Sequence, residues 1–393
     1  PRAMAGWAAL GVAALAVALA TCLGYVALLT DLAPAPLAFP PLRPLPEEKV
    51  PLHVELLFKD DPTFRGPESF VVLEDGSLVT GLADGRIVKI LLSPKNNAQY
   101  ETIMRTGEDL PTCGDLASEP VCGRPLGMRA HPSEPDHLLV IDTYLGLLDV
   151  DLSARRSEVL VAPSVGNFSM MNDMDLSADG KIVYFTNTGR FPRNQIHRNL
   201  IEARPTGSVW SYHLDTRALA PVAMDLAMPN GITLSYNGDS LLVCSTLLSA
   251  VYDIPISADP SGEERAPLKA SMIQFFAEDL QGTPDNIRRL DPHRKTYSVA
   301  LGSKRALPFS LPQFLAPFTT LRKLLCLLDL ETMTAFIPRS GIFIELDEAG
   351  TQVAHYQDLE GESNWYSEVE HVEGFFYLGS WRTPFLARAR VGL

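Results

Sequence analysis

The sequence predicts an all-β protein of the six-bladed β-propeller class, with an N-terminal transmembrane helix and a short helical insertion before or within the last blade. The first observation is that short runs alternate apolar and polar residues, as half-buried strands do, while few segments show helical periodicity. The second is that tight turn pairs separate these runs, among them Asp75-Gly76, Asp179-Gly180 and Asn237-Gly238. Strand, tight turn, strand and a short link to a further strand therefore form the basic unit.

The third observation is that this unit recurs along the chain. Its starts are spaced by 57, 47, 58, 56 and 82 residues and lie near Glu68, Pro125, Asn172, Asn230, Asn286 and Glu368. Self-similar units of this size are typical of propeller blades or of a β-sandwich array. Six blades are the simplest account, and a closed ring would also remove the exposed strand edges that many short antiparallel strands create.

The wide last spacing indicates an insertion at about residues 303–340. Within it, Leu321, Leu324, Leu325 and Leu328 recur at helical spacing and predict an apolar stripe. We expect a helix that packs on top of the propeller. The alternative is a lid over the mouth that also touches a membrane, although only Arg322 and Lys323 supply the basic face of an interfacial helix.

The N-terminus carries no charged residue from Ala3 to Thr30. Because a bilayer-spanning helix needs about 20 apolar residues, we interpret residues 1–31 as a cytoplasmic remnant and a transmembrane signal anchor. A cleaved signal peptide is the alternative, but its apolar region is shorter. Arg2 before the run and Asp31 after it indicate a cytoplasmic N-terminus, hence a single-pass type II protein of the plasma membrane or endoplasmic reticulum.

The segment after the anchor divides the rest of the chain. Residues 32–51 are crowded with proline, which favours extended polyproline geometry, so we expect a stiff stalk. Residues 52–393 would form the propeller, in the lumen or outside the cell. The net charge of −14 makes nucleic acid a poor partner, because phosphates need a basic surface.

The cysteines and one sequon bear on the compartment. Cys113 and Cys122 lie in a polar, loop-like stretch, where a lumenal or extracellular location would favour a disulfide; two free thiols or half a metal site are the alternatives. Cys244 and Cys326 lie in apolar runs and fit buried thiols. The sequon at Asn167 agrees with a lumenal domain.

Carboxylate and carboxamide side chains recur at the starts of the strands that would line the channel. They are Glu68, Asn172, Asn230, Asp285 and Asn286. Each alone also fits a turn or capping role. Because inner strands converge on a propeller's axis, the set together predicts a Ca²⁺ site, since Ca²⁺ takes six to eight oxygen ligands in flexible geometry. The absence of Cys and His from the set argues against zinc or copper.

The chain resembles the strictosidine synthase-like family of six-bladed propellers, which is related to the paraoxonases. The resemblance rests on "GPESF", "TGLADGRIVKI", "EPVCGRPLGMRA", "MNDMDLSADGKIVYFTN", "PNGITLS", "PDNIRR", "SEVEH" and "FYLGSWRTPFLARA". It implies a lumenal or extracellular propeller, a Cys113–Cys122 disulfide, glycosylation at Asn167 and a central calcium. It carries the calcium ligands of the paraoxonase type onto the five residues named above. Asn187 and Cys244 depart from the acidic residues common in membrane-anchored relatives.

The expected activity is calcium-dependent hydrolysis of aryl esters or lactones, at a modest rate. Water would be the nucleophile, assisted by Glu68 or Asp285, and a small apolar ester or lactone would lie against walls that include Phe70 and Phe276. Leu126 stands where the resemblance would place an imidazole.

The remaining candidate catalytic residues are supported by fewer observations. His131 fits a turn residue rather than a catalytic one. Glu368, with Glu370 as a competitor, lies near the glutamate with which strictosidine synthase condenses an amine and an aldehyde, and we expect that reaction least. The alternative function is a non-catalytic cell-surface propeller whose calcium is structural and which binds a protein partner.

Overall fold

Most of the described residues lie after the apolar N-terminal run. The computed structural model describes residues 31–37, 39, 41–42, 44–92, 98–256, 266–305, 310–335 and 337–391, with isolated positions between residues 13 and 25. The predicted anchor lies mostly outside these residues, and within them no helix is long and apolar enough to cross a bilayer.

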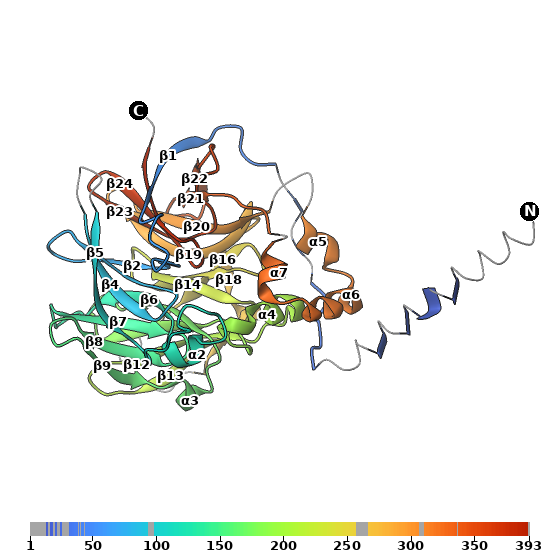
Figure 1. The fold of residues 1–393 in the computed structure, drawn as a ribbon, viewed down its shortest axis with the longest axis horizontal. Coiled ribbons are helices and arrows are strands. Elements are labelled where there is room, and N and C mark those ends of the chain that lie inside the picture. Colours follow the sequence, from blue (N-terminus) through green and yellow to red (C-terminus); the bar gives the residue numbers. More distant parts are fainter. Residues whose placement is uncertain are drawn as a thin grey trace, which may run out of the picture.

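Antiparallel strands joined by tight turns build the described body, as the sequence predicts. Four sheets are built around runs of three or four strands that follow one another along the chain (Figure 1). The first contains β2 (Phe70–Val72), β3 (Leu78–Gly81), β4 (Arg86–Leu91) and β5 (Gln99–Arg105). The second contains β6 (Pro125–Ala130), β7 (His137–Asp142), β8 (Gly146–Asp151) and β9 (Arg156–Val161).

The third and fourth sheets follow the same plan. The third contains β10 (Met171–Leu176), β11 (Ile182–Asn187), β12 (Gly207–His213), β13 (Leu219–Leu226) and the short β17 (Leu268–Lys269). The fourth contains β14 (Pro229–Leu234), β15 (Ser240–Ser245), β16 (Ala250–Pro255) and β18 (Gln274–Ala277).

The fifth sheet has eight strands and joins two antiparallel groups. One group is β19 (Gly282–Asp291), β20 (Thr296–Lys304), β21 (Ile342–Leu346) and β22 (Gln352–Gln357). The other is β23 (Tyr366–Val372), β24 (Phe375–Ser380), β25 (Leu386–Val391) and β1 (Val50–Leu57). The described strands thus form five sheets rather than the six predicted, because parallel pairing of Val50 with Tyr356 and of Pro51 with Gln357 merges two groups into one sheet.

The strands that begin each group lie next to one another inside the body. In the described part of the chain β2 contacts β6, β6 contacts β10, β10 contacts β14, β14 contacts β19, β19 contacts β23, and β23 contacts β2. We call these the inner strands. Apolar side chains fill the spaces between consecutive groups, and one cluster packs Leu78 and Val88 of the first sheet against Tyr377 and Leu386 of the last group. The body is therefore an all-β, propeller-like ring.

The helices lie in connections near the starts of the inner strands. We call this side of the ring the site face. The short helices there are α2 (Glu119–Cys122), α3 (Pro163–Gly166), η1 (Arg193–Gln195) and α4 (Ile196–Glu202). The exception is η2 (Ala270–Met272), which leads into β18, whose first residues pair near the end of β16 on the opposite side. The insertion contains α5 (Leu311–Leu315), α6 (Thr319–Leu324), η3 (Leu325–Leu327) and α7 (Leu330–Thr334). It follows Lys304, which pairs with Gly282 at the start of β19, and this register puts it on the site face.

The insertion differs from the single helix with a buried stripe that the spacing predicts. Its helical pieces are short, and Leu321 is exposed while Leu324, Leu325 and Leu328 are half-buried. Pro312 and Pro317 explain the short pieces, because proline is tolerated at the first turn of a helix and interrupts its interior. Figure 1 shows α4 to α7 together on the side of the body from which the N-terminal part leaves.

Candidate metal centre

The same irregularity occurs in five inner strands. Each has a register shift just after its first residues: between Pro125 and Met128, Met171 and Met174, Pro229 and Ile232, Pro284 and Ile287, and Tyr366 and Val369. A β-bulge of this kind leaves residues outside the regular ladder and re-aims their side chains. The bulges contain Asn172, Asn230, Asp285, Asn286 and Glu368, so the fold presents them at one level of the ring.

The bulges need small residues where neighbouring inner strands meet. A Cβ on Gly231 would lie 2.3 Å from Cα of Asn286, and a Cβ on Gly127 would lie 2.4 Å from Oδ1 of Asp173. Glycine is therefore required at these two positions for close approach rather than for a special backbone angle. Gly231 is the second residue of the Asn230-Gly231 pair, so this pair serves the site and not a hairpin turn.

The structure brings four of the five predicted ligands into one network of contacts. Asn286 Nδ2 donates to Glu68 Oε1 at 3.3 Å, and Asn230 lies close enough to Asp285 to act on the pKa of its carboxyl group in the lowering direction. Asp285 is also close enough to Glu68 for the charge of Glu68 to raise its pKa. Asn172 is buried in the bulge of β10, at the position that Asn230 occupies in β14.

Four of the predicted ligand atoms have no protein partner. Oε2 of Glu68 and Oδ1 of Asn172, Asn230 and Asn286 are buried and accept no hydrogen bond from the described residues. A buried acceptor without a partner costs about 1–3 kcal/mol. Four such oxygens together fit an oxygen-coordinated cation, because Ca²⁺ takes carboxylate and amide oxygens of this kind. The residues present therefore suit the predicted ion.

Hydrogen bonds hold the amide nitrogens of Asn230 and Asn286 in place. Asn230 Nδ2 donates to Oγ1 of Thr246 at 3.1 Å, and Thr246 Oγ1 donates to the carbonyl of Pro284 at 2.8 Å. Asn286 Nδ2 also donates to Oε2 of Glu368 at 3.1 Å. These bonds orient each amide so that its oxygen faces away from the donor side, which leaves the oxygen available to a ligand.

Burial and mutual repulsion act on the carboxyl groups here. Burial, with the nearby charge of Glu68, raises the pKa of Asp285 well above its ordinary value. Burial also raises the pKa of Glu68, against the opposing charges of Arg124 and Arg288. Two neighbouring carboxyl groups with raised pKa values mark a site where a divalent cation would be stabilising. Asp285 alone of the five is half-buried rather than buried.

A buried arginine lies just below these oxygens, and sequence reasoning missed it. Arg288 binds Asp173 through two nitrogens, at 2.7 and 3.0 Å, and its Nη2 donates to Oε2 of Glu368 at 2.6 Å. Arg288 lies two residues after Asn286 on β19, so strand alternation places both on the same face. That spacing is the signal that would have found it.

Glu368 is thus an ion-pair partner of Arg288 on an inner strand. Burial raises the pKa of Glu368 to about 8, in opposition to Arg288. Its competitor Glu370 lies further along β23, where burial raises its pKa to about 6. Because the carboxyl groups of Asp173 and Glu368 are hydrogen-bonded to Arg288, the carboxylates left for a cation are Glu68 and Asp285.

Other residues of the sequence analysis lie elsewhere. Leu126 is buried in the bulge of β6, so this inner strand offers no imidazole there. Phe70 packs in the core between the first and last groups, and Phe276 packs with its ring 5.6 Å from that of Tyr297 in the core cluster between the fourth and fifth sheets. The expectation that Phe70 and Phe276 line the mouth is therefore wrong, because both rings fill spaces between sheets.

His131 lies on the side of the ring away from the bulges. It follows the end of β6, and with Glu134 and Asp149 it forms a group whose ligating atoms lie within 4.8 Å of one another. His137 Nδ1 lies 2.8 Å from Oδ1 of the same Asp149. Because His131 lies at the opposite end of β6 from the bulge, its imidazole cannot act on the buried oxygens of the candidate metal centre.

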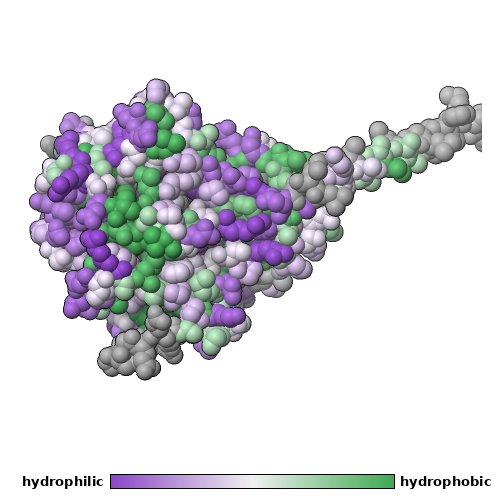
Figure 2. Space-filling view, turned by 90° about the horizontal axis from the view of Figure 1, so that it is seen from below, coloured by the Kyte–Doolittle hydropathy of each residue, from purple (hydrophilic) through white to green (hydrophobic). Residues whose placement is uncertain are grey.

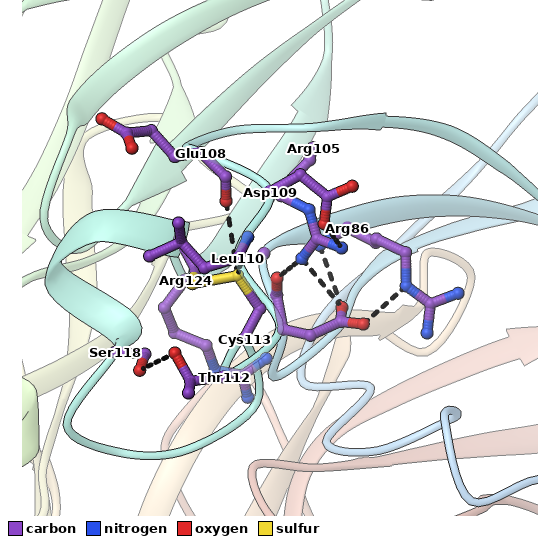
Figure 3. The surroundings of a disulfide bond; sticks show 12 residues. Arg86, Arg105, Glu108, Asp109, Leu110, Thr112, Cys113, Ser118 and Arg124 are labelled. Carbon is purple, nitrogen blue, oxygen red and sulfur yellow. Dashed lines mark hydrogen bonds and ion pairs between the residues drawn. A yellow bond between two sulfur atoms is a disulfide. The ribbon is translucent and has the colours of Figure 1, made fainter.

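The disulfide links Cys113 to Cys122, as expected (Figure 3). It closes the loop before β6, next to Arg124, whose Nη1 donates to the carbonyl of Gly66 at 2.9 Å. Arg124 is fully buried, and burial lowers its pKa to about 10. Of the free thiols in the described residues, Cys244 is buried as expected, whereas Cys326 is only half-buried. Asn167 is exposed at the end of α3.

Comparisons with solved structures agree with the fold. A luciferin-regenerating enzyme matches with a TM-score of 0.58 at 10% identity, covering 87% of this chain and 96% of that one. A calcium-binding regucalcin from Agrobacterium tumefaciens matches with 0.55 at 12%, covering 88% and 96%. A putative gluconolactonase matches with 0.53 at 13%, covering 90% and 98%.

Comparisons of sequence give the family. The strictosidine synthase model matches residues 172–256, and the strictosidine synthase-like N-terminal model matches residues 56–90. Adipocyte plasma membrane-associated protein is 34% identical over 344 residues in Danio rerio and 33% identical over 344 in Homo sapiens, covering 86% of this chain and 77% of each relative. Strictosidine synthase-like protein 10 of Arabidopsis thaliana is 32% identical over 329 residues, covering 82% and 84%. The chain therefore belongs to the strictosidine synthase-like family, together with adipocyte plasma membrane-associated protein.

Proposed function

We propose that this chain is a calcium-dependent hydrolase of aryl esters or lactones, of modest activity, on a six-bladed ring anchored in a membrane. Each half of the eight-stranded sheet counts as one blade in this proposal. The observation that carries it is the group of buried oxygens without partners on Glu68, Asn172, Asn230 and Asn286. The calcium binding of regucalcin and the named activity of gluconolactonase agree with it, although they belong to those proteins.

The five proposed calcium ligands have different roles. Asn172, Asn230 and Asn286 would hold the ion through their amide oxygens, with Glu68 and Asp285 supplying the charge. When bound, such an ion supplies Lewis acidity toward an ester carbonyl. Asp285 is the carboxylate nearest to solvent, because it is half-buried while Glu68 is buried. We assign the acceptance of the proton of the attacking water to Asp285, and to Glu68 a ligand role.

The absence of an imidazole in the bulge of β6 supports a modest rate. Leu126 fills that position with an apolar side chain that cannot accept a proton. General acid–base catalysis by a positioned side chain contributes typically 10²–10⁴-fold, so relying on a carboxylate that also serves the ion costs part of that factor. We place amine–aldehyde condensation by Glu368 outside the proposal, because Arg288 occupies this carboxylate.

The membrane part of the proposal rests on the sequence and the relatives. Residues 3–30 carry no charge, and relatives at 33–34% identity are named plasma membrane-associated. The Cys113–Cys122 disulfide and the exposed Asn167 of the sequon fit a ring outside the cell or in the lumen. A single-pass type II arrangement fits the uncharged run, the names of the relatives, the disulfide and the sequon.

The second candidate is a structural calcium in a ring that binds a protein partner. The specific observation in its favour is the low exposure of Glu68, Asn172, Asn230 and Asn286, which limits access to the oxygens. An ion shared by several inner strands would stabilise the ring by mass action even without catalysis.

The test is hydrolysis of phenyl acetate by the full chain in detergent, with calcium, with chelator, and with Asn230→Ala. The matched control is Asn237→Ala, which changes the other Asn-Gly pair of the same strand pair at an exposed turn. We expect the rate to vanish with chelator and with Asn230→Ala and to persist in Asn237→Ala. Calcium-raised melting with an unchanged background rate would establish the structural role instead. No effect of calcium on either readout would contradict the ligand assignment.

A further inference from the structure

The insertion exposes large apolar side chains on the site face. Phe314, Phe318, Leu321 and Leu327 are 56%, 49%, 44% and 62% exposed. The rings of Phe314 and Phe318 lie 5.7 Å apart between centroids, and all four residues fall within α5, α6, η3 and the link between them. Single exposed apolar residues are ordinary, but a contiguous group marks an interaction site. We call these four side chains the insertion patch.

The insertion patch lies in a stretch of the sequence without acidic residues. No Asp or Glu occurs between Asp291 and Asp329, in a chain with a net charge of −14. Of the two cations of α6, Lys323 is half-buried and Arg322 is buried. Membrane surfaces are commonly anionic and repel carboxylates, so a stretch without acids is compatible with close approach to lipid headgroups.

The chain enters the body beside this patch. Asp31 forms an ion pair with Arg198 of α4, and Ala33 N donates to Oε1 of Glu202 at 3.0 Å. Leu32 is buried against Phe191 and Ile201 and is contacted by Leu325 and Cys326 of η3. The predicted stalk thus begins on the surface of the ring.

Arg322 fastens the insertion to this entry point. It is buried, and its guanidinium donates to the carbonyls of Ile201 at 2.7 Å and Ala35 at 2.9 Å. Since Ala35 belongs to the entering chain and Ile201 to α4, one side chain ties three segments together. The insertion patch is therefore held at a fixed place relative to Asp31.

Asp31 directly follows the uncharged run of residues 3–30. If that run spans a bilayer, as the proposed function states, the membrane surface lies within a few residues of Asp31. Figure 2 shows hydrophobic surface on the body close to where the N-terminal part leaves it. We propose that the insertion patch rests on the lipid bilayer that holds the N-terminal anchor, so that the site face is turned toward the membrane.

The test uses tryptophan as a depth probe in the full chain. Phe318→Trp and the control Val353→Trp are reconstituted separately into phosphatidylcholine vesicles with and without bromine on the acyl chains. Val353 is 51% exposed on β22, just after the turn at the end of the strands away from the insertion. Both changes replace exposed side chains, and matching melting temperatures verify that the variants are folded.

We expect brominated lipid to quench the emission of Phe318→Trp beyond that of the wild type, and to leave the added emission of Val353→Trp unchanged. Flotation with the vesicles after carbonate washing tests the anchor separately. Flotation without quenching at position 318 would overturn the proposal while the anchor stands, and would leave the patch to a protein partner or a second copy. Loss of flotation would remove the anchor and the proposal together.

Discussion

Asp173 and Arg288, which are 115 residues apart in the sequence, form a buried ion pair through two hydrogen bonds of 2.7 and 3.0 Å. The same guanidinium reaches Glu368 of β23, so one arginine joins inner strands from three groups of the ring. Removing one partner of a buried ion pair leaves an uncompensated charge in a medium of low polarity.

We expect Arg288→Met to lower the free energy of unfolding by about 3–5 kcal/mol, because Glu368 would lose its ion-pair partner and Asp173 would keep only the longer 3.8 Å pair with Arg129. Arg288→Lys should restore part of this loss, since it keeps the charge but not the forked geometry. Denaturant unfolding of each variant measures the effect. The control is Glu158→Gln, which breaks an exposed pair with Arg217 and should cost under about 1 kcal/mol. Equal stability of Arg288→Met and wild type would contradict the role of Arg288 as a buried ion-pair partner that joins three inner strands.

We expect Gly231→Ala to weaken calcium binding and to lower stability by about 1–3 kcal/mol, because the new Cβ would lie 2.7 Å from Oδ1 of Asn286. Gly302→Ala is the matched control near the same site, where the nearest atom to a new Cβ is Oδ2 of Asp285 at 3.6 Å, an ordinary contact. Calorimetric titration with calcium and thermal melting give the two readouts. A Gly231→Ala variant that binds calcium as tightly as Gly302→Ala would rule out the close approach of β14 to Asn286.

We expect the double change Cys113→Ala and Cys122→Ala to lower the free energy of unfolding by about 2–3 kcal/mol, because the disulfide closes a loop with a sequence separation of 9 residues. Denaturant unfolding with and without reductant checks this. Reductant should bring the wild type to the level of the double variant and should leave the double variant unchanged. A further drop of the double variant in reductant would point to another redox-sensitive bond.

We expect the ring to lose stability as the pH falls below the ordinary pKa of histidine, with His355 as one cause. Burial lowers the pKa of His355 on β22, and the charges of Lys49 and Lys304 act in the same direction. The folded state therefore binds fewer protons than the unfolded state in this range, so stability rises with pH there and levels off above pH ~6.5.

The variant His355→Phe should flatten this slope, whereas the exposed control His293→Gln should keep it. Unfolding free energies at several pH values below and above neutrality provide the measurement. The same slope in His355→Phe and wild type would exclude the buried ring as a cause.

The positions of the proposed ligands could be predicted because each inner strand repeats one local pattern. Asn230 illustrates this: it lies at the start of β14, before the apolar run of that strand, and cannot belong to the turn that Asn237 serves. The register shifts that present Asn230 and Asn286 could not be read from the sequence, since a bulge depends on the pairing of both strands. Arg288 and Asp173 were missed because the chain separates them widely and only ring closure joins them.

The merging of two groups into one sheet was also beyond the sequence pattern. It depends on Val50 and Pro51 pairing with Tyr356 and Gln357, and on the path of the chain from the site face to β1. Phe276 shows the same limit, because an apolar ring before a turn fits a mouth and an inter-sheet space equally well. Only the packing of its ring against Tyr297 decides between them.

The pairing of β1 with β25 sets an order of events during synthesis. Glu55 and its partner Arg388 are 333 residues apart, so the first strand of the ring emerges from the ribosome long before its neighbour exists. At 5–20 residues per second this interval is ~17–70 s. Throughout it, β1 presents an unpaired edge beside an apolar N-terminal segment, and the last group cannot close. Ring closure thus waits until β25 has been synthesised, which makes β25 the strand whose loss leaves the ring open between β1 and β24.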